Sequence, residues 1–154
     1  MNKPVVKPLF VAVDFDGTCV THEFPRVGKD IGAVPVLKRL VDQGHKLILY
    51  TMRSDLEPAF FQKVEGIDQD IIATDGKYLF DAISWFEVNG IDLYATQMNP
   101  TQSAWTKSNK CYAHVYIDDA AMGCPLIHNK EVSDRPYVDW VEMERLLVER
   151  GILN

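Results

Sequence analysis

The sequence has few cysteines, no long apolar run and no excess of basic residues, and each absence excludes a class of protein. Its 154 residues include three cysteines, Cys19, Cys111 and Cys124, which follow no metal-binding spacing such as C-x-x-C. A sparse, odd set of this kind predicts reduced thiols rather than a disulfide framework. We therefore expect a cytoplasmic protein.

Membrane insertion and secretion are equally disfavoured. No stretch of the sequence approaches the ~20 apolar residues that a membrane-spanning helix needs. Lys3 and Lys7 precede an apolar run, as in a signal peptide, but that run, 9–13, is ended at once by Asp14. It is too short for the apolar core of a signal peptide. We expect no membrane partner.

The charge of the chain argues against long nucleic acid as a partner. The formal net charge is -6, which leaves no basic excess to follow a phosphate backbone. A short phosphorylated end remains compatible, because a few local cations would hold it. Hydrophobic residues make up 47% and charged residues 25%, the balance of an ordinary globular protein, and the length suits one domain over 1–154.

Apolar segments alternate with amphipathic ones, which is typical of an α/β protein with a parallel sheet. The predicted strands lie at 8–15, 46–50, 91–95 and 113–117, with a short fifth at 125–128. The predicted helices lie at 34–41, 80–88 and 137–149, and Gly44 is placed to end the first. We expect a three-layer α/β/α Rossmann-like sheet without a large cap domain.

The segment 54–77 fits this alternation less well. Pro58 suits the first turn of a helix. The pair Asp75-Gly76 is compatible either with a hairpin turn or with a cap on the next helix. We expect a helix with an irregular return, which is either an extra surface helix or a small lid beside the site.

Polar side chains follow the predicted strands at their carboxyl ends, where parallel α/β sheets bind ligands. The first strand ends in Asp14 and Asp16, the second in Thr51 and the fourth in Asp118-Asp119. Several carboxylates in one place repel one another unless a cation neutralises them. Such oxygen ligands suit Mg²⁺, which also shields a phosphate from an attacking carboxylate. The sequence therefore predicts a site for magnesium-assisted phosphoryl transfer.

Two further residue types complete this prediction. Thr51 is able to donate a hydroxyl hydrogen bond to the transferred group, and Lys110, before the fourth strand, to balance charge on its oxygens. Lys107 competes with Lys110 for that role. Each feature alone has an ordinary structural explanation, such as a turn, a cap or a solvated side chain. Their order at successive strand ends is what favours catalysis.

The same residues resemble the motifs of the haloacid dehalogenase-like (HAD) superfamily. The string 11–18 looks like its motif I, 47–51 its motif II, Lys110 its motif III and 115–119 its motif IV. The resemblance runs from the first strand to Gly123. It is nearest to the small bacterial and phage hydrolases of that superfamily that lack a large cap.

The resemblance implies a role for each motif residue. Asp14 would attack phosphorus to form an aspartyl-phosphate and would also bind Mg²⁺. Asp16 would protonate the leaving oxygen and then activate water, with its backbone carbonyl on the metal. Asp118 would complete the protein ligands to Mg²⁺, and Asp119 would support it directly or through water. Thr51 would hold the phosphoryl oxygens.

Residues beside the motifs are candidates for substrate contacts. Arg53 follows Thr51 closely and is the expected substrate-binding residue. His22 and Arg26 lie in the loop where the superfamily carries its mobile flap. Each of them either controls access to the site or lies beside it without a role in function.

These observations favour a Mg²⁺-dependent phosphatase that acts on a phosphate monoester, with a small phosphorylated metabolite or nucleotide as substrate. The alternatives are a catalytically silent scaffold that uses the fold for binding, and a phosphatase of polynucleotide ends. A phosphoryl-accepting receiver domain is disfavoured, because receivers carry their acidic pair on the first strand. The oligomeric state and the exact substrate are left open by the sequence.

Overall fold

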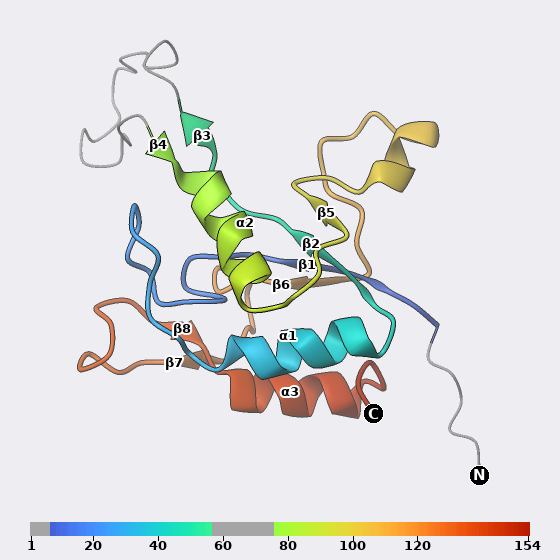
Figure 1. Cartoon of the computed structure of the whole chain (residues 1–154). Coiled ribbons are helices and arrows are strands. Elements are labelled where there is room, and N and C mark those ends of the chain that lie inside the picture. Colours follow the sequence, from blue (N-terminus) through green and yellow to red (C-terminus); the bar gives the residue numbers. More distant parts are fainter. Residues whose placement is uncertain (1–6, 57–75) are drawn as a thin grey trace.

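The computed structural model describes residues 7–56 and 76–154, and its centre is a sheet of four parallel strands (Figure 1). The strands are β1 (Phe10–Val13), β2 (Lys46–Leu49), β5 (Ala95–Thr96) and β6 (Val115–Ile117), in the order β5-β2-β1-β6. A parallel sheet joined by helices confirms the predicted α/β class. The third predicted strand, 91–95, is shorter and later than expected, because only Ala95 and Thr96 pair with β2.

The central strand β1 explains why its sequence is almost wholly apolar. It pairs with β2 on one side and β6 on the other, so that Val11 lies opposite both Leu47 and Val115. Val11, Ala12 and Val13 are buried. A strand buried on both faces has no solvent side on which polar residues would be favoured.

Within 7–56 and 76–154, three α-helices accompany the sheet: α1 (Ala33–Asp42), α2 (Tyr78–Val88) and α3 (Trp140–Glu149). Residues of all three share one core cluster with Val11, Val13, Leu47 and Leu49. Because these strand positions alternate, their side chains point to a single face of the sheet. All three helices therefore pack on that face, and α1 and α3 lie side by side there in Figure 1.

The opposite face of the sheet is covered differently from the prediction. Phe10 contacts the rings of Tyr94, Tyr112 and His114, with centroids 5.6 to 5.7 Å apart. Among the described residues, the helical element on this side is the short 3₁₀ turn η3 (Pro100–Ala104), which Figure 1 draws across the sheet from α1 and α3. In the part of the chain that the structure describes, aromatic packing and this turn thus stand where a second layer of α-helices was expected.

Helix ends follow their local sequence closely. Gly44 adopts a φ of 95° just after α1, as its predicted capping position requires. Helix α3 begins later than predicted, because Asp139 caps it by accepting a hydrogen bond from the Glu142 amide at 3.1 Å. No helix in the described residues has both the length and the apolar character to span a membrane.

The described part of the chain has two small antiparallel strand pairs outside the main sheet. The first joins β3 (Asp55–Leu56) to β4 (Gly76–Lys77), and the second joins β7 (Leu126–Ile127) to β8 (Tyr137–Val138). The predicted strand 125–128 therefore belongs to a hairpin and not to the central sheet. The helix and lid expected from Pro58 onward fall within 57–75, outside the described residues.

Candidate active site

A cavity of about 520 Å³ lies at the carboxyl ends of β1, β2 and β6. Its lining combines four aspartates (Asp14, Asp16, Asp118 and Asp119) with Thr51, two arginines and an apolar side that includes Phe24, Leu56 and Tyr78. The structure therefore gathers most of the predicted site residues in one place. Their position at strand ends is the usual ligand site of a parallel α/β sheet.

Three of the carboxylates form a group suited to a cation. One oxygen from each of Asp14, Asp118 and Asp119 lies within 4.8 Å of the other two. Asp14 follows β1, and its amide donates to the Ile117 carbonyl at 2.9 Å, which fixes it beside the end of β6. Hard oxygen donors at this spacing fit Mg²⁺. Asp16 does not join this trio with its side chain.

Thr18 links two members of the trio, Asp14 and Asp119, a role that the sequence did not reveal. Its buried hydroxyl lies 3.0 Å from Asp14 Oδ2 and 3.1 Å from Asp119 Oδ1, and it accepts a hydrogen bond from the Asp119 amide at 3.0 Å. The single hydroxyl proton is donated to one carboxylate at a time. Thr18 stands in the motif I string, but nothing in its spacing marked it as a bridge between two strand ends.

Gly17 makes the close approach of Asp119 sterically allowed. Its φ is 78°, and a Cβ added there would lie 2.5 Å from Asp119 Oδ2. Glycine is the residue that tolerates both this backbone conformation and the contact. The Asp-x-Asp-Gly turn thus leaves room for the carboxylate of Asp119, which follows β6, to reach the end of β1.

The pKa values of Asp14 and Asp118 show that ionised carboxylates are disfavoured where they lie this close together. Burial first, then the hydrogen-bonded carboxyl of Asp119 and the charge of Asp118, together raise the pKa of Asp14 to about 8. The pKa of Asp118 is also raised, first by burial. A divalent cation would offset this repulsion and favour the ionised forms. The donor set therefore fits a bound Mg²⁺ ion.

Thr51 is held at the cavity by a residue in an unusual conformation. Gln97 has a φ of 68°, and its side-chain amide accepts from the Thr51 amide at 2.9 Å and donates to the Thr51 carbonyl at 2.7 Å. The hydroxyl of Thr51 accepts a hydrogen bond from the Arg53 amide at 3.1 Å, so its own proton is available to a bound group. No sequence pattern identified Gln97 as this support.

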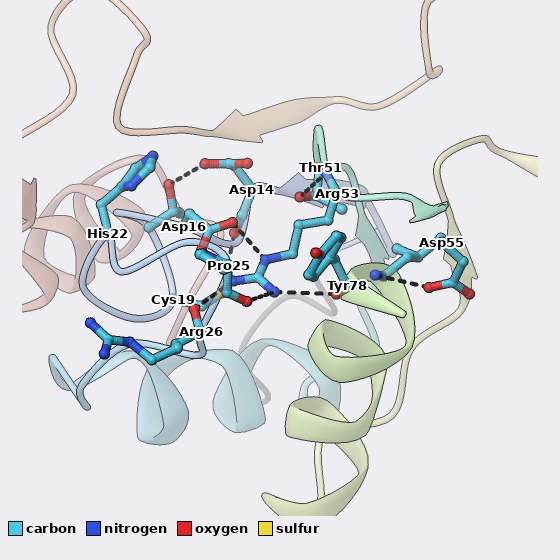
Figure 2. A network of polar contacts seen from close by, with 12 residues as sticks. Asp14, Asp16, Cys19, His22, Pro25, Arg26, Thr51, Arg53, Asp55 and Tyr78 are labelled. Carbon is cyan, nitrogen blue, oxygen red and sulfur yellow. Dashed lines mark hydrogen bonds and ion pairs between the residues drawn. The ribbon is translucent and has the colours of Figure 1, made fainter. Parts of the chain in front are cut away.

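Arg53 lines the cavity, yet its guanidinium is directed into the protein. Nε and Nη2 each donate to a carboxylate oxygen of Asp16 at 2.7 Å, and Figure 2 shows the remaining contacts with backbone carbonyls. Nη1 donates to the carbonyl oxygens of Pro25 and Tyr78, each at 3.3 Å, and Nη2 donates to the carbonyl oxygen of Arg26 at 2.8 Å. The five N–H donors of the guanidinium are thereby engaged. In this conformation Arg53 supports Asp16 instead of presenting a donor to substrate.

The predicted lysines are not brought to the cavity. Lys110 is exposed, and its Nζ lies 5.4 Å from the centroid of the Tyr116 ring. Lys107 is exposed as well, and neither lysine contributes to the lining. Arg26 points to solvent and pairs with Glu23 at 3.8 Å, whereas its backbone carbonyl binds Arg53.

Sequence reasoning missed the second arginine of the cavity. Arg135, in the loop between β7 and β8, lines it together with His22, and its Nη1 lies 3.0 Å from His22 Nε2. Its position more than a hundred residues from His22 left no local pattern to find.

Cys19 lies under the site but does not supply a nucleophile. Its thiol donates to the Asp14 carbonyl at 3.2 Å and is fully buried. Burial raises the pKa of the thiol well above its usual value, and the charges of Asp14 and Asp16 raise it further. The thiolate required for nucleophilic attack is thus disfavoured.

Comparison with known proteins gives a likeness of fold. No protein-family model matches the sequence, and no curated protein matches it. A solved structure of a conserved protein from Bacteroides thetaiotaomicron is 28% identical, with a TM-score of 0.65. The similarity covers 94% of this chain and 93% of that one, so the α/β architecture extends over nearly the whole of both.

Proposed function

We propose that this protein is a Mg²⁺-dependent phosphatase of the HAD type, which hydrolyses a phosphate monoester through an aspartyl-phosphate on Asp14. The observation that carries the proposal is the convergence of Asp14, Asp118 and Asp119 at the ends of two adjacent parallel strands. Thr51, at the end of the next strand, lines the same cavity. Carboxylates grouped in this way suit a metal-assisted reaction at phosphorus.

The proposed chemistry needs two displacements at phosphorus. A carboxylate oxygen of Asp14 forms a bond to phosphorus as the ester P–O bond breaks, and the leaving oxygen takes a proton from Asp16. Water then attacks the phosphorus of the aspartyl-phosphate, giving its proton to Asp16 and releasing phosphate and free Asp14. The hydroxyl of Thr51 donates to a phosphoryl oxygen throughout.

Mg²⁺, held by Asp14, Asp118 and Asp119 and by the Asp16 carbonyl, would supply positive charge to the phosphoryl oxygens. Arg53 pairs with ionised Asp16, the form that accepts a proton from water. The protonated form, which serves the leaving oxygen, requires one of the two hydrogen bonds to Arg53 to open. Arg53 is thus a positioning residue in this scheme.

The dimensions of the cavity favour a small substrate. About 520 Å³ is within the range of about 300–1,000 Å³ typical of small-molecule sites. In this proposal the phosphate end lies at Asp14 and the Thr51 hydroxyl, and Phe24, Leu56 and Tyr78 offer an apolar surface to the organic part. A phosphorylated metabolite or mononucleotide suits this division.

Hydrolysis of p-nitrophenyl phosphate tests the proposal. Purified protein should release nitrophenol with Mg²⁺ and not with EDTA, and Asp14→Asn should lose the activity while keeping its circular dichroism spectrum. Unchanged release by Asp14→Asn would show that Asp14 is not the nucleophile. A well-folded protein that binds Mg²⁺ but hydrolyses no phosphate ester in a broad panel would favour the binding scaffold.

A further inference from the structure

The two arginines of the cavity differ in their partners. Arg53 is 2% exposed and is neutralised by Asp16 in a bidentate ion pair. Arg135 is exposed, and within the described residues its guanidinium has no carboxylate at ion-pair distance. Among these residues no carboxylate pairs with it where it lines the cavity, so the donors that do not contact His22 are available to an anion that enters there.

His22 orients Arg135 without cancelling its charge. The guanidinium only donates hydrogen bonds, so His22 Nε2 accepts from Arg135 Nη1 at 3.0 Å, and the contact brings no negative charge to the guanidinium. Both residues line the cavity that Asp14 and Asp16 also line. The pair thus places an oriented cation on the wall of the cavity that holds the carboxylates.

A phosphate dianion needs such a cation in this cavity. The three carboxylates of Asp14, Asp118 and Asp119 outweigh the two charges of a Mg²⁺ ion bound among them. Bringing a dianion to the same place is costly unless further positive charge faces it. Arg53 cannot serve, because its donors are engaged, and Lys110 does not line the cavity.

We propose that Arg135, oriented by His22, is the cation that binds the phosphoryl group of the substrate. The inference rests on the proposed phosphatase function and assigns a binding residue to that site. A guanidinium presents parallel N–H groups that match two phosphate oxygens, which a lysine ammonium does not. Arg135 thereby fills the role for which the sequence suggested Lys110.

Binding of inorganic phosphate to the Mg²⁺-loaded protein, measured by calorimetry, tests the assignment separately from catalysis. Arg135→Met should weaken phosphate binding about tenfold or more, which corresponds to about 1.4 kcal/mol or more. It should raise the KM for p-nitrophenyl phosphate by a similar factor, with a smaller effect on kcat. Arg135→Lys should recover part of the loss, and His22→Ala should lose less than Arg135→Met.

Lys130→Met is the matched control. Lys130 lies in the same loop and donates to the Asp134 carbonyl at 2.7 Å, but it does not line the cavity. Its removal takes one positive charge from the loop and should leave phosphate binding unchanged. An equal loss in both variants would indicate a general effect of loop charge and would overturn the assignment.

The outcomes separate this inference from the proposed function. Unchanged phosphate binding in Arg135→Met would overturn it, even if the protein is a Mg²⁺-dependent phosphatase. Loss of binding in Lys110→Met but not in Arg135→Met would overturn it in favour of the lysine. Phosphate binding that depends on Arg135, in a protein that hydrolyses no ester, would support the assignment while the proposed catalysis fails.

Discussion

Arg53 and Asp16 face each other in a buried bidentate ion pair, in which Nε–Oδ2 and Nη2–Oδ1 are both 2.7 Å apart. The Arg53 side chain is 1% exposed and that of Asp16 is 12% exposed. The same guanidinium also binds the loop at Pro25 and the start of α2 at Tyr78. One side chain therefore joins the proposed acid–base residue to two other segments of the cavity wall.

Loss of Arg53 should destabilise the whole fold. Arg53→Met leaves a buried carboxylate and several carbonyls without their donor, which typically costs about 3–5 kcal/mol. Arg53→Lys keeps the positive charge but loses the bidentate hydrogen bonds to Asp16, so its loss of stability should be intermediate. Urea unfolding measures both. Arg145→Met, which breaks the exposed pairs with Glu142 and Glu149, is the control and should change stability little. Equal effects of Arg53→Met and Arg145→Met would contradict this account.

The role of Asp16 should depend on the leaving group. Asp16→Asn should lower kcat for an alkyl phosphate about 10²–10⁴-fold, since an alkoxide leaves poorly without a proton. The loss should be much smaller for p-nitrophenyl phosphate in the first displacement, because nitrophenolate leaves without one. Burst kinetics separate that step from hydrolysis of the intermediate. Identical losses in the burst rate for both substrates would rule out proton donation by Asp16.

The pKa of Asp14 predicts how the stability of the metal-free protein changes with pH. Its folded-state pKa of about 8 lies above the ordinary value of 3.8, so the folded state holds the proton more tightly. The resulting stabilisation is complete below pH 4 and is lost as the pH rises through 8. Asp14→Asn removes this dependence.

In EDTA, the melting temperature of Asp14→Asn should therefore exceed that of the wild type at pH 8.5, on the order of 5 °C. The difference should shrink at pH 5. Mg²⁺ should stabilise the wild type more than the variant. Melting curves with the same pH dependence for both proteins would show that Asp14 is not the titrating group.

Gly17 and Gly44 separate backbone strain from the contact with Asp119. Both have positive φ values, 78° and 95°, so alanine should cost each position about 1–2 kcal/mol of stability. A Cβ at Gly17 would meet Asp119 Oδ2 at 2.5 Å, whereas one at Gly44 would have no atom within 4 Å. Only Gly17→Ala should weaken Mg²⁺ binding, measured by calorimetry. Weakening in both variants would refute the role of this contact.

The sequence predicted those parts of the protein that depend on local pattern. The apolar run before Asp14 predicted the central strand β1, and Gly44 predicted where α1 ends. The acidic residues at the ends of β1 and β6 were expected to meet because parallel strands end at one edge of the sheet. The cavity lining brings them together.

The remaining features depend on long-range contacts that local pattern does not encode. Arg53 follows Thr51 and so was expected to bind substrate, but its pairing with Asp16 depends on how the two loops pack. Arg135 reaches His22 from a hairpin that the sequence did not predict. The second helical layer was expected from the alternation of apolar and amphipathic segments alone, whereas α1, α2 and α3 all share one core with alternate residues of β1 and β2 and so lie on one face of the sheet.

The proposed function depends on an aspartyl-phosphate on Asp14, and chemical trapping detects this intermediate. The protein is mixed with a phosphate monoester and Mg²⁺, quenched and reduced with borohydride, which converts an acyl phosphate to an alcohol, and then digested for mass spectrometry. We predict conversion of Asp14 to homoserine that requires both substrate and Mg²⁺ and does not occur in EDTA. Release of phosphate with Asp14 intact, or conversion at another aspartate, would show that Asp14 is not the nucleophile.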